Sequence, residues 1–361
     1  MVENLNACDE CGMCLDFCPT YKVTGNELLS PMGRIKAMNV IFQQGEVTPE
    51  IKESVYSCTR CASCVLVCPQ EIDIPTFIAK SKIELAKRGL GPLERHQGVI
   101  EGLKKLDNAV GGDPEKRWQW LPEKMPTKQS DTLFYVGCLP AYLVQDCAIS
   151  SYLVLRKLNV DFMMLEDEGC CGIYFYESGR DDLARERFEQ NAERFRRLGI
   201  KRIIVSCAGC YRCFKSYYPE MLGKVDFEVV HIVELLAELL RGRELKQQED
   251  MEVTYHDSCR IGRMAGIYQQ PREILKQCGV TIKEMEGNKE NAPCCGAGAA
   301  VRSVYRELSS KMAQEVLAQA KANAVVTCCP FCVFNLVHAP SQEEKGKSIL
   351  YIARIALDSL A

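Results

Sequence analysis

Cysteine is the residue that most constrains this chain, which has 22 cysteines in 361 residues, most of them at regular short spacings. The first ten residues contain neither the basic cluster nor the apolar run of a signal peptide. We therefore expect a cytoplasmic protein, in which thiols stay reduced. Clusters of reduced thiols indicate metal binding rather than disulfide bonds.

Two runs share the pattern C-x2-C-x2-C-x3-C-P, which is typical of cubane [4Fe–4S] ligation. The fourth cysteine of such a run is expected to start a helix and to reach the other cluster. The predicted ligand sets are Cys8, Cys11, Cys14 and Cys68 for one cluster, and Cys58, Cys61, Cys64 and Cys18 for the other. A pair of zinc sites is the alternative, but zinc needs neither the third cysteine nor the proline.

Helices are expected at residues 31–38 and 49–56, so residues 1–90 are predicted to form a helical ferredoxin-type domain. Residues 91–130 contain several Gly and Pro residues and no long periodic segment, which predicts a linker and packing arm. Trp118 and Trp120 lie in this arm, and we expect them to anchor it on a neighbouring domain.

The remainder of the chain is an internal repeat. Cys138 corresponds to Cys259, Cys170-Cys171-Gly172 to Cys294-Cys295-Gly296, and the CxxC at 207–210 to that at 329–332. The offsets are 121 (138 to 259), 124 (170 to 294) and 122 (207 to 329). Three nearly equal offsets predict two duplicated domains, at 131–247 and 248–361.

Each repeat is predicted to be an α/β unit in which short apolar strands end at the cysteines. Strands are expected before Cys138 and Cys259, at 160–165 and 280–285, and before each CxxC. Helices are expected at 142–158, 180–197, 272–277 and 301–320. Alternation of strands and helices predicts short parallel sheets, whose carboxyl ends are where α/β folds place their ligand sites.

Each repeat contributes five cysteines, one more than a cubane or a zinc ion requires. The two sets are Cys138, Cys170, Cys171, Cys207 and Cys210, and Cys259, Cys294, Cys295, Cys329 and Cys332. The fifth thiol is either a spectator or part of an unusual cluster. Both neighbouring cysteines can bind one group only if the backbone turns sharply, which Gly172 and Gly296 permit.

The spacing of these motifs resembles the tandem cysteine-rich CCG domains of heterodisulfide reductases. With the two-cluster ferredoxin domain in front, nearly the whole chain resembles the D-subunit family of these enzymes. The resemblance implies that each CCG domain binds a noncubane [4Fe–4S] cluster through its five cysteines, and that the two clusters face each other across a disulfide site.

Four cysteines fall outside this pattern. Cys328 directly precedes Cys329 and could replace it as a ligand, and Cys213 could compete with Cys210. We choose Cys329 because it preserves the CxxC spacing with Cys332. Cys147 and Cys278 match no motif and are expected to be small buried apolar residues.

His256 lies in the run His256-Asp257-Ser258-Cys259, at the end of a predicted strand. A histidine at this place could protonate a departing thiolate near neutral pH. In the alternative, His256 and Asp257 only hydrogen-bond the loop and orient Cys259. His96, His231 and His338 are expected to be structural.

The net charge of −3 argues against a nucleic-acid partner, and no apolar stretch is long enough to span a membrane. Neither a Rossmann glycine fingerprint nor a Walker loop is present, so no flavin or nucleotide site is expected in this chain. A flavin would belong to a partner. The expected redox partner is a flavoprotein or a membrane cytochrome subunit, which would place the chain at the membrane only peripherally.

Three functions remain open. The first is a thiol–disulfide oxidoreductase that receives electrons through its cubanes; the resemblance suggests the coenzyme M–coenzyme B mixed disulfide as a candidate substrate. The second is an electron-transfer subunit of a flavin-dependent glycolate, lactate or glycerol-3-phosphate dehydrogenase. In the third, zinc at one or both CCG sites only stabilises the fold.

Overall fold

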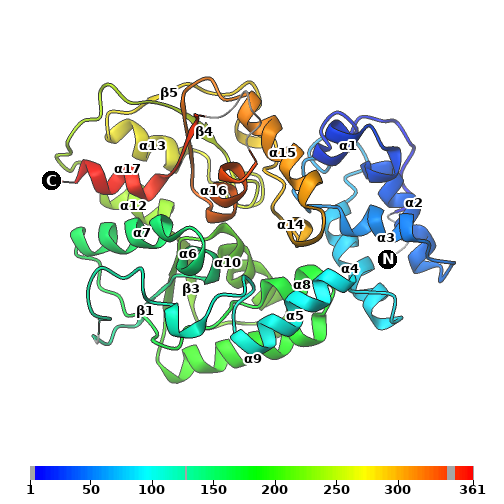
Figure 1. Cartoon of the computed structure of the whole chain (residues 1–361), viewed down its shortest axis with the longest axis horizontal. Coiled ribbons are helices and arrows are strands. Elements are labelled where there is room, and N and C mark those ends of the chain that lie inside the picture. Colours follow the sequence, from blue (N-terminus) through cyan, green and yellow to red (C-terminus); the bar gives the residue numbers. More distant parts are fainter. Residues whose placement is uncertain (1–4, 127, 340–345, 361) are drawn as a thin grey trace.

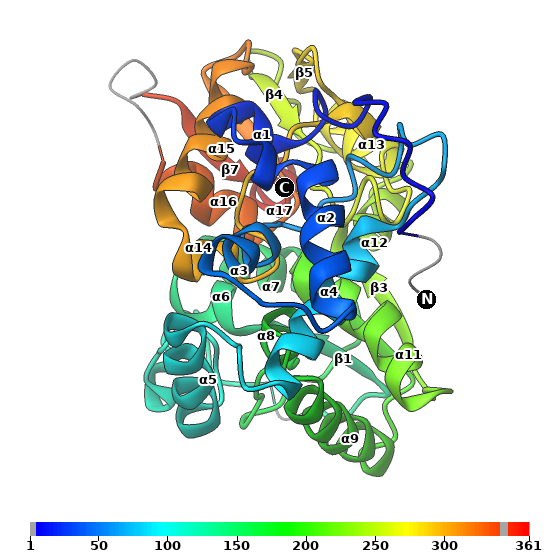
Figure 2. The same cartoon turned by 90° about the vertical axis from the view of Figure 1, so that its right-hand side faces the viewer.

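A computed structural model describes residues 5–126, 128–339 and 346–360. Its three parts are seen in Figure 1: a helical N-terminal part at the right, a first α/β unit below, and a second α/β unit at the upper left. Figure 2 views the N-terminal helices face-on, in front of the two α/β units. This arrangement confirms the predicted fold class.

The N-terminal part contains short helices, and all of its α-helices have a proline at their first or second position. They are α1 (Pro19–Thr24), the 3-10 turn η1 (Glu27–Leu29), α2 (Pro31–Phe42), α3 (Pro49–Tyr56) and α4 (Ile74–Lys87). The side chains of Ser30, Thr48 and Asp73 accept hydrogen bonds from backbone N–H groups in the first turns of α2, α3 and α4. The helix expected after the second cysteine run begins only at Ile74, so Cys68 does not start it as Cys18 starts α1.

The arm between the N-terminal part and the first sheet differs from its prediction, because it contains the 13-residue helix α5 (Glu94–Leu106). Its buried face comprises only His96, Ile100 and Leu103. An apolar stripe this sparse gives little periodic signal in the sequence. After α5 the arm includes the turn η2 (Pro114–Lys116). Trp120 is buried against Tyr152, and Trp118 donates to the Glu166 carbonyl, so both tryptophans anchor the arm.

Two short parallel sheets form the centres of the α/β units. The first has the order β1 (Thr132–Tyr135), β2 (Arg202–Val205), β3 (Glu228–His231). The second has the order β5 (Thr281–Ile282), β4 (Glu252–His256), β6 (Ala324–Thr327), β7 (Ser348–Tyr351). Strands β1, β2, β3, β4 and β6 are buried beyond their first residue, as expected of parallel sheets covered by helices, whereas the edge strands β5 and β7 are only partly buried.

The helices of the first unit are α6 (Cys138–Tyr142), α7 (Gln145–Lys157), α8 (Ile173–Ser178), α9 (Asp181–Arg197), α10 (Ala208–Arg212), the π-helix η3 (Cys213–Tyr217), α11 (Tyr218–Leu222) and α12 (Ile232–Leu239). Those of the second are α13 (Gln269–Gln277), the turn η4 (Lys289–Asn291), α14 (Val301–Val304), α15 (Arg306–Ala318), α16 (Pro330–Val337) and α17 (Ile352–Ser359). α17 packs on α7 of the first unit, and α16 contacts α6 and α10 (Figure 1). The cysteine loops of both units therefore lie near their common boundary.

Some local predictions were wrong. The strand expected at 160–165 is a single bridge between Leu133 and Met163, and the helix expected at 301–320 is divided at Tyr305. Each unit also ends in a strand and helix that were not predicted, β3 with α12 and β7 with α17. Whether a run this short forms a strand depends on the sheet edge that it joins rather than on its own hydrophobic periodicity. No helix in the described ranges is long and apolar enough to cross a membrane.

Two buried histidines make the stability of this fold depend on pH. Burial lowers the pKa of His96 and of His231 to about 3. The unfolded chain takes up a proton on each imidazole below pH 6.5 while the folded chain does not, so stability is lost as pH falls. We expect a loss of about 2 kcal/mol per histidine between pH 7 and pH 5, measured by anaerobic denaturant unfolding. His231→Asn should lose its share of this pH dependence, whereas His338→Asn, at an exposed position, should retain all of it.

Candidate iron–sulfur sites

The five cysteines predicted for the first CCG site come together from three segments. Cys138 opens α6, Cys170 and Cys171 lie in the loop before α8, and Cys207 and Cys210 flank the start of α10. Their thiols form a continuous chain of contacts in the order Cys138, Cys170, Cys171, Cys210, Cys207. The three segments thus place five sulfur atoms at one locus.

The second repeat builds the same arrangement. Its thiols contact one another in the order Cys259, Cys294, Cys295, Cys332, Cys329, and the Sγ atoms of Cys332 and Cys295 are 3.2 Å apart. All of these cysteines except Cys259 are buried. Two sites with the same order of contacts make the duplication a structural as well as a sequence repeat.

A glycine after each cysteine pair allows the backbone to turn. Gly172 has φ +87° and Gly296 has φ +85°, in the region that L side chains rarely adopt. A Cβ at Gly296 would lie 2.6 Å from the Ser309 carbonyl oxygen. The N–H groups of both glycines donate to the first sulfur of the pair, at 3.4 Å. This turn is what lets two adjacent thiols face one site, as predicted.

In each site, the second cysteine of the adjacent pair has a lowered pKa, which favours its thiolate form. Hydrogen bonds from Cys170, Cys210 and Cys213 hold the pKa of Cys171 well below its ordinary value. Those from Cys294 and Cys332 do the same for Cys295. The pKa of Cys329, which caps α16, is lowered to about 7, chiefly by a hydrogen bond from Cys332. Thiolates are the form of cysteine that binds metal.

The four cysteines outside the pattern lie in different surroundings. Cys328 hydrogen-bonds with the Tyr255 hydroxyl, whereas Cys329 contacts Cys332. Cys213 donates to the Cys171 carbonyl oxygen at 3.3 Å and also contacts the Cys171 thiol. Cys147 and Cys278 are fully buried in the hydrophobic core.

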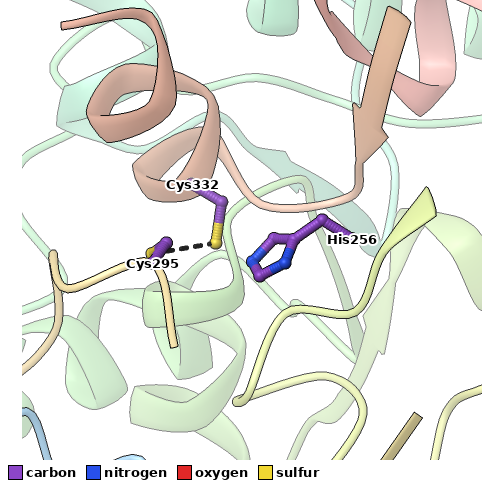
Figure 3. A group of neighbouring side chains, drawn as sticks. All are labelled: His256, Cys295 and Cys332. Atoms are coloured by element: carbon purple, nitrogen blue, oxygen red, sulfur yellow. Dashed lines mark hydrogen bonds between the residues drawn. The ribbon is translucent and has the colours of Figure 1, made fainter. Parts of the chain in front are cut away.

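His256 projects from the end of β4 toward the second site (Figure 3). A ring nitrogen and the sulfur atoms of Cys295 and Cys332 lie within 4.8 Å of one another, and all three residues are buried. The ring interacts with the Cys295 sulfur, and neither ring nitrogen has an oxygen or nitrogen hydrogen-bond partner in the described part of the chain. Asp257 instead orients the loop, since it pairs with Arg272 and accepts from the Lys289 N–H.

The structure brings together the thiols of one of the two predicted N-terminal sets. One cavity is lined by Cys18 of the first run together with Cys58, Cys61 and Cys64 of the second. The buried Arg34 guanidinium lies beside it and donates to Thr20, Ser57 and the Cys18 sulfur. Its positive charge lies beside these cysteine sulfur atoms, which suits a negatively charged cluster. Cys8 and Cys11 lie near Cys14, and Cys11 is exposed.

A buried ion network that sequence reasoning missed joins the three parts of the molecule. The carboxylate of Glu177, in α8, pairs with Arg60 at 2.9 Å and with Arg260 at 2.8 Å. Arg60 lies between Cys58 and Cys61 of the second cysteine run, and Arg260 follows Cys259. Lys82 of α4 donates to the backbone carbonyls of Glu177 and Ala299. The partners of Glu177 are so far apart in the chain that no local pattern marks them.

A cavity of about 410 Å³ lies between the two α/β units. Its lining is mainly apolar and includes all five cysteines of the second site, together with Leu139, Ile173 and Phe334 of the surrounding walls. Arg302 and Arg306 also line it. Neither arginine is paired with a carboxylate among the described residues. The cavity can therefore hold a small molecule against the second site with cations beside it.

Comparisons with known families agree with this geometry. Residues 132–215 and 253–337 each match the Cysteine-rich domain (CCG) family, and residues 4–72 match the 4Fe-4S dicluster domain family. The D-subunit of the dihydromethanophenazine:CoB–CoM heterodisulfide reductase of Methanosarcina barkeri is 33% identical, over 92% of this chain and 88% of that protein.

The chain belongs to the D-subunit family of heterodisulfide reductases. Its other relatives show how varied the reactions of such proteins are. The B-subunit of the fumarate reductase (CoM/CoB) of Methanothermobacter marburgensis is 28% identical, over 95% of this chain and 70% of that protein. The EtfAB:quinone oxidoreductase of Syntrophomonas wolfei is 29% identical, over 95% of this chain and 57% of that protein.

The same fold occurs at much lower sequence identity. A hypothetical protein from Helicobacter pylori superposes with a TM-score of 0.61 at 11% identity, over 96% of this chain and 71% of that one. Together, the family and the converging thiols identify this heterodisulfide reductase relative as an iron–sulfur oxidoreductase subunit. The contacts among the thiols and the buried arginine fit bound iron–sulfur clusters.

Proposed function

We propose that this chain is the disulfide-cleaving subunit of a thiol–disulfide oxidoreductase. The observation that carries the proposal is the cavity between the α/β units, which exposes the five cysteines of a CCG site to a small molecule. Two cubanes would be held by the predicted sets, Cys8, Cys11, Cys14 and Cys68, and Cys58, Cys61, Cys64 and Cys18. One noncubane [4Fe–4S] cluster would be held by each set of five CCG cysteines.

The proposed reaction takes up two electrons and two protons and converts one disulfide into two thiols. The clusters supply single electrons and a place at which a thiolate can bind iron. The chain's own residues hold the disulfide in an apolar cavity and exclude water from it. Electrons come from a partner subunit, either a flavoprotein or a membrane cytochrome, and we propose that no flavin binds to this chain.

The two arginines of the cavity favour an anionic substrate. Arg302 stacks on Phe334 and Arg306 is exposed at the start of α15, so both charges are available to a carboxylate, sulfonate or phosphate. The mixed disulfide of coenzyme M and coenzyme B is the candidate that the relatives' names suggest.

His256 is proposed to deliver a proton to a departing thiolate at the second site. A ring nitrogen lies within 4.8 Å of the sulfur atoms of Cys295 and Cys332, and the ring interacts with the Cys295 thiol. His256→Ala is expected to lower the disulfide-reducing rate by about 100-fold, the smaller end of the range for general acid catalysis. His338→Ala, which is exposed, is the matched control. A His256→Ala protein with a full rate and intact clusters would remove the proton-donor role.

Metal analysis tests the proposed cofactors directly. Anaerobically purified protein is expected to contain about 16 iron atoms per chain, four for each of four clusters. A new paramagnetic signal is expected when oxidised protein is treated with a thiol. About eight irons with one or two zinc ions would instead indicate that the CCG sites are structural, and the proposal would be wrong.

The alternative is an electron-transfer subunit of a flavin-dependent dehydrogenase. The relationship to the EtfAB:quinone oxidoreductase gives this alternative its support. In that case the clusters would be reduced when glycolate, lactate or glycerol 3-phosphate is added to a complex with a flavoprotein. Disulfides would then fail to reoxidise them.

A further inference from the structure

Four lysine or arginine side chains are buried in the part of the chain that the structure describes: Arg34, Arg60, Lys82 and Arg117. Arg60 and Arg117 each pair with a buried glutamate. Among the described residues, Arg34 and Lys82 have no carboxylate within ion-pair distance. Because burial of an unpaired charge is costly, these two cations need a negative charge of another kind beside them.

The hydrogen bonds of Arg34 hold its guanidinium in place without neutralising it. The residue lies in α2 and is 2% exposed. Its Nε donates to the Ser54 carbonyl oxygen at 2.9 Å. Its terminal nitrogens donate to neutral oxygen atoms of Leu29, Thr20 and Ser57. The orientation of the positive charge is therefore fixed, and the charge remains.

That charge is directed at cysteine sulfur atoms. A terminal nitrogen of Arg34 lies 3.5 Å from the Cys18 sulfur. Burial opposes the charge of Arg34, but interactions with Cys58, Cys18 and Cys64 outweigh it, and its pKa is raised. Burial lowers the pKa of Lys82 only to about 8, so most of this side chain is charged at pH 7, and it also interacts with Cys58. Both unpaired cations thus act on one predicted ligand set, termed the inner set: Cys18, Cys58, Cys61 and Cys64.

The other predicted set lies in different surroundings. It is termed the outer set and comprises Cys8, Cys11, Cys14 and Cys68. Lys36 acts on Cys8, but it is already paired with Glu10 at 3.0 Å, and both side chains are more than half exposed. Water and salt screen an exposed pair of this kind. Cys11 is itself exposed. The outer set therefore has the weaker positive field and the more solvated surroundings.

We infer that Arg34, supported by Lys82, raises the reduction potential of the cubane at the inner set above that of the cubane at the outer set. The inference rests on the cubane sets of the proposed function and applies to both candidate functions. Each reduction adds one electron and hence one negative charge to a cluster. A buried cation beside the cluster stabilises that charge more than an exposed one does. The first electron received from the partner should therefore settle at the inner set and leave the outer set oxidised.

The inner set is also the one that borders the α/β units. The Cys61 thiol hydrogen-bonds with the Cys294 thiol, and Cys294 also donates to the Thr59 hydroxyl at 3.6 Å. Arg263 donates to the Cys61 carbonyl oxygen at 3.0 Å and so holds this loop in place. When an electron moves inward, the outer set is oxidised and the inner set is reduced by the same single electron. Arg34 would thus keep the electron at the boundary with the α/β units.

Replacement of Arg34 tests the inference by a potential rather than by turnover. Arg34→Gln in the full-length, anaerobically purified protein is titrated with dithionite at known potentials and followed by EPR. The ratio of reduced to oxidised protein for the higher-potential cubane should fall at least about tenfold at any given potential, a downward shift of about 59 mV for one electron. The lower-potential cubane should change by less than about twofold in this ratio, or about 18 mV.

Arg88→Gln is the matched control. Arg88 also lies in the N-terminal part and donates to the backbone carbonyls of Ile41 and Gly45, at 3.1 Å each, without bonding a cysteine. Its replacement removes the same charge and should leave both potentials unchanged. Unchanged potentials in Arg34→Gln with both cubanes present, or an equal shift in Arg88→Gln, overturn the inference.

A variant of the outer set assigns the two signals without changing Arg34. Cys11→Ser offers an oxygen ligand, which favours the oxidised cluster, so the lower-potential signal should shift downward or disappear. A change confined to the higher-potential signal means that the order of the two cubanes is reversed, and it overturns the inference even if Arg34→Gln does not fold. Wild-type protein without any cubane signal would overturn the proposed cofactors as well, whereas two cubanes in the reversed order overturn this inference alone.

Discussion

Cys329→Ser is expected to remove the cluster of the second CCG site, whereas Cys328→Ser should leave it in place. The two cysteines are adjacent, but only the Cys329 thiol contacts Cys332, and only its pKa is lowered. The iron content should fall from about 16 to about 12 per chain in Cys329→Ser. The disulfide-reducing rate should fall by more than about 100-fold, beyond the range for loss of a residue that only supports a metal ligand.

Cys328→Ser is the matched control for this experiment. Its side chain hydrogen-bonds with the Tyr255 hydroxyl, a contact that serine can also make. We expect full iron content and a rate close to that of the wild type. The opposite pattern, with iron lost from Cys328→Ser and retained in Cys329→Ser, would show that the ligand assignment has been reversed.

Glu177→Gln should destabilise the protein by about 3–5 kcal/mol, because it leaves two buried guanidinium groups without their carboxylate. The side chains of Glu177 and Arg60 are 3% and 6% exposed, and that of Arg260 is 12% exposed. The size of the effect comes from the unpaired charges that remain rather than from the ion pairs alone. Anaerobic denaturant unfolding of wild type and variant measures it.

Burial and these ion pairs act in opposite directions on Glu177, and the arginines prevail, so its folded pKa is about 2. Since this pKa is below the unfolded value, the contribution of Glu177 to stability is present above about pH 4.3 and is lost as pH falls toward 2. Glu177→Gln should remove that part of the acid dependence. Lys36→Ala breaks an exposed ion pair with Glu10 and should leave the unfolding midpoint unchanged. Equal unfolding midpoints for Glu177→Gln and the wild type would contradict the role given to the network.

Sequence spacing predicted most of the sulfur chemistry, because metal ligands must repeat at spacings that the backbone can turn through. The grouping of Cys18 with Cys58, Cys61 and Cys64 follows the predicted exchange of fourth ligands. The five-thiol chains follow the predicted repeat. Helix α5 was missed because its buried face has only three residues, and β3 and β7 because they are held by neighbouring strands.

The cysteine pattern alone determined the family, the duplicated α/β fold and the sets of sulfur atoms that meet. Only the tertiary structure decided what surrounds each site, since the arm at Cys138, the loop of Cys61 at Cys294 and the cavity are made by segments distant in the chain. Repeats with nearly the same local spacing produce the same local turns. The segments that cover each cysteine loop are set by packing between domains, and the cysteine spacing within a repeat does not predict that packing.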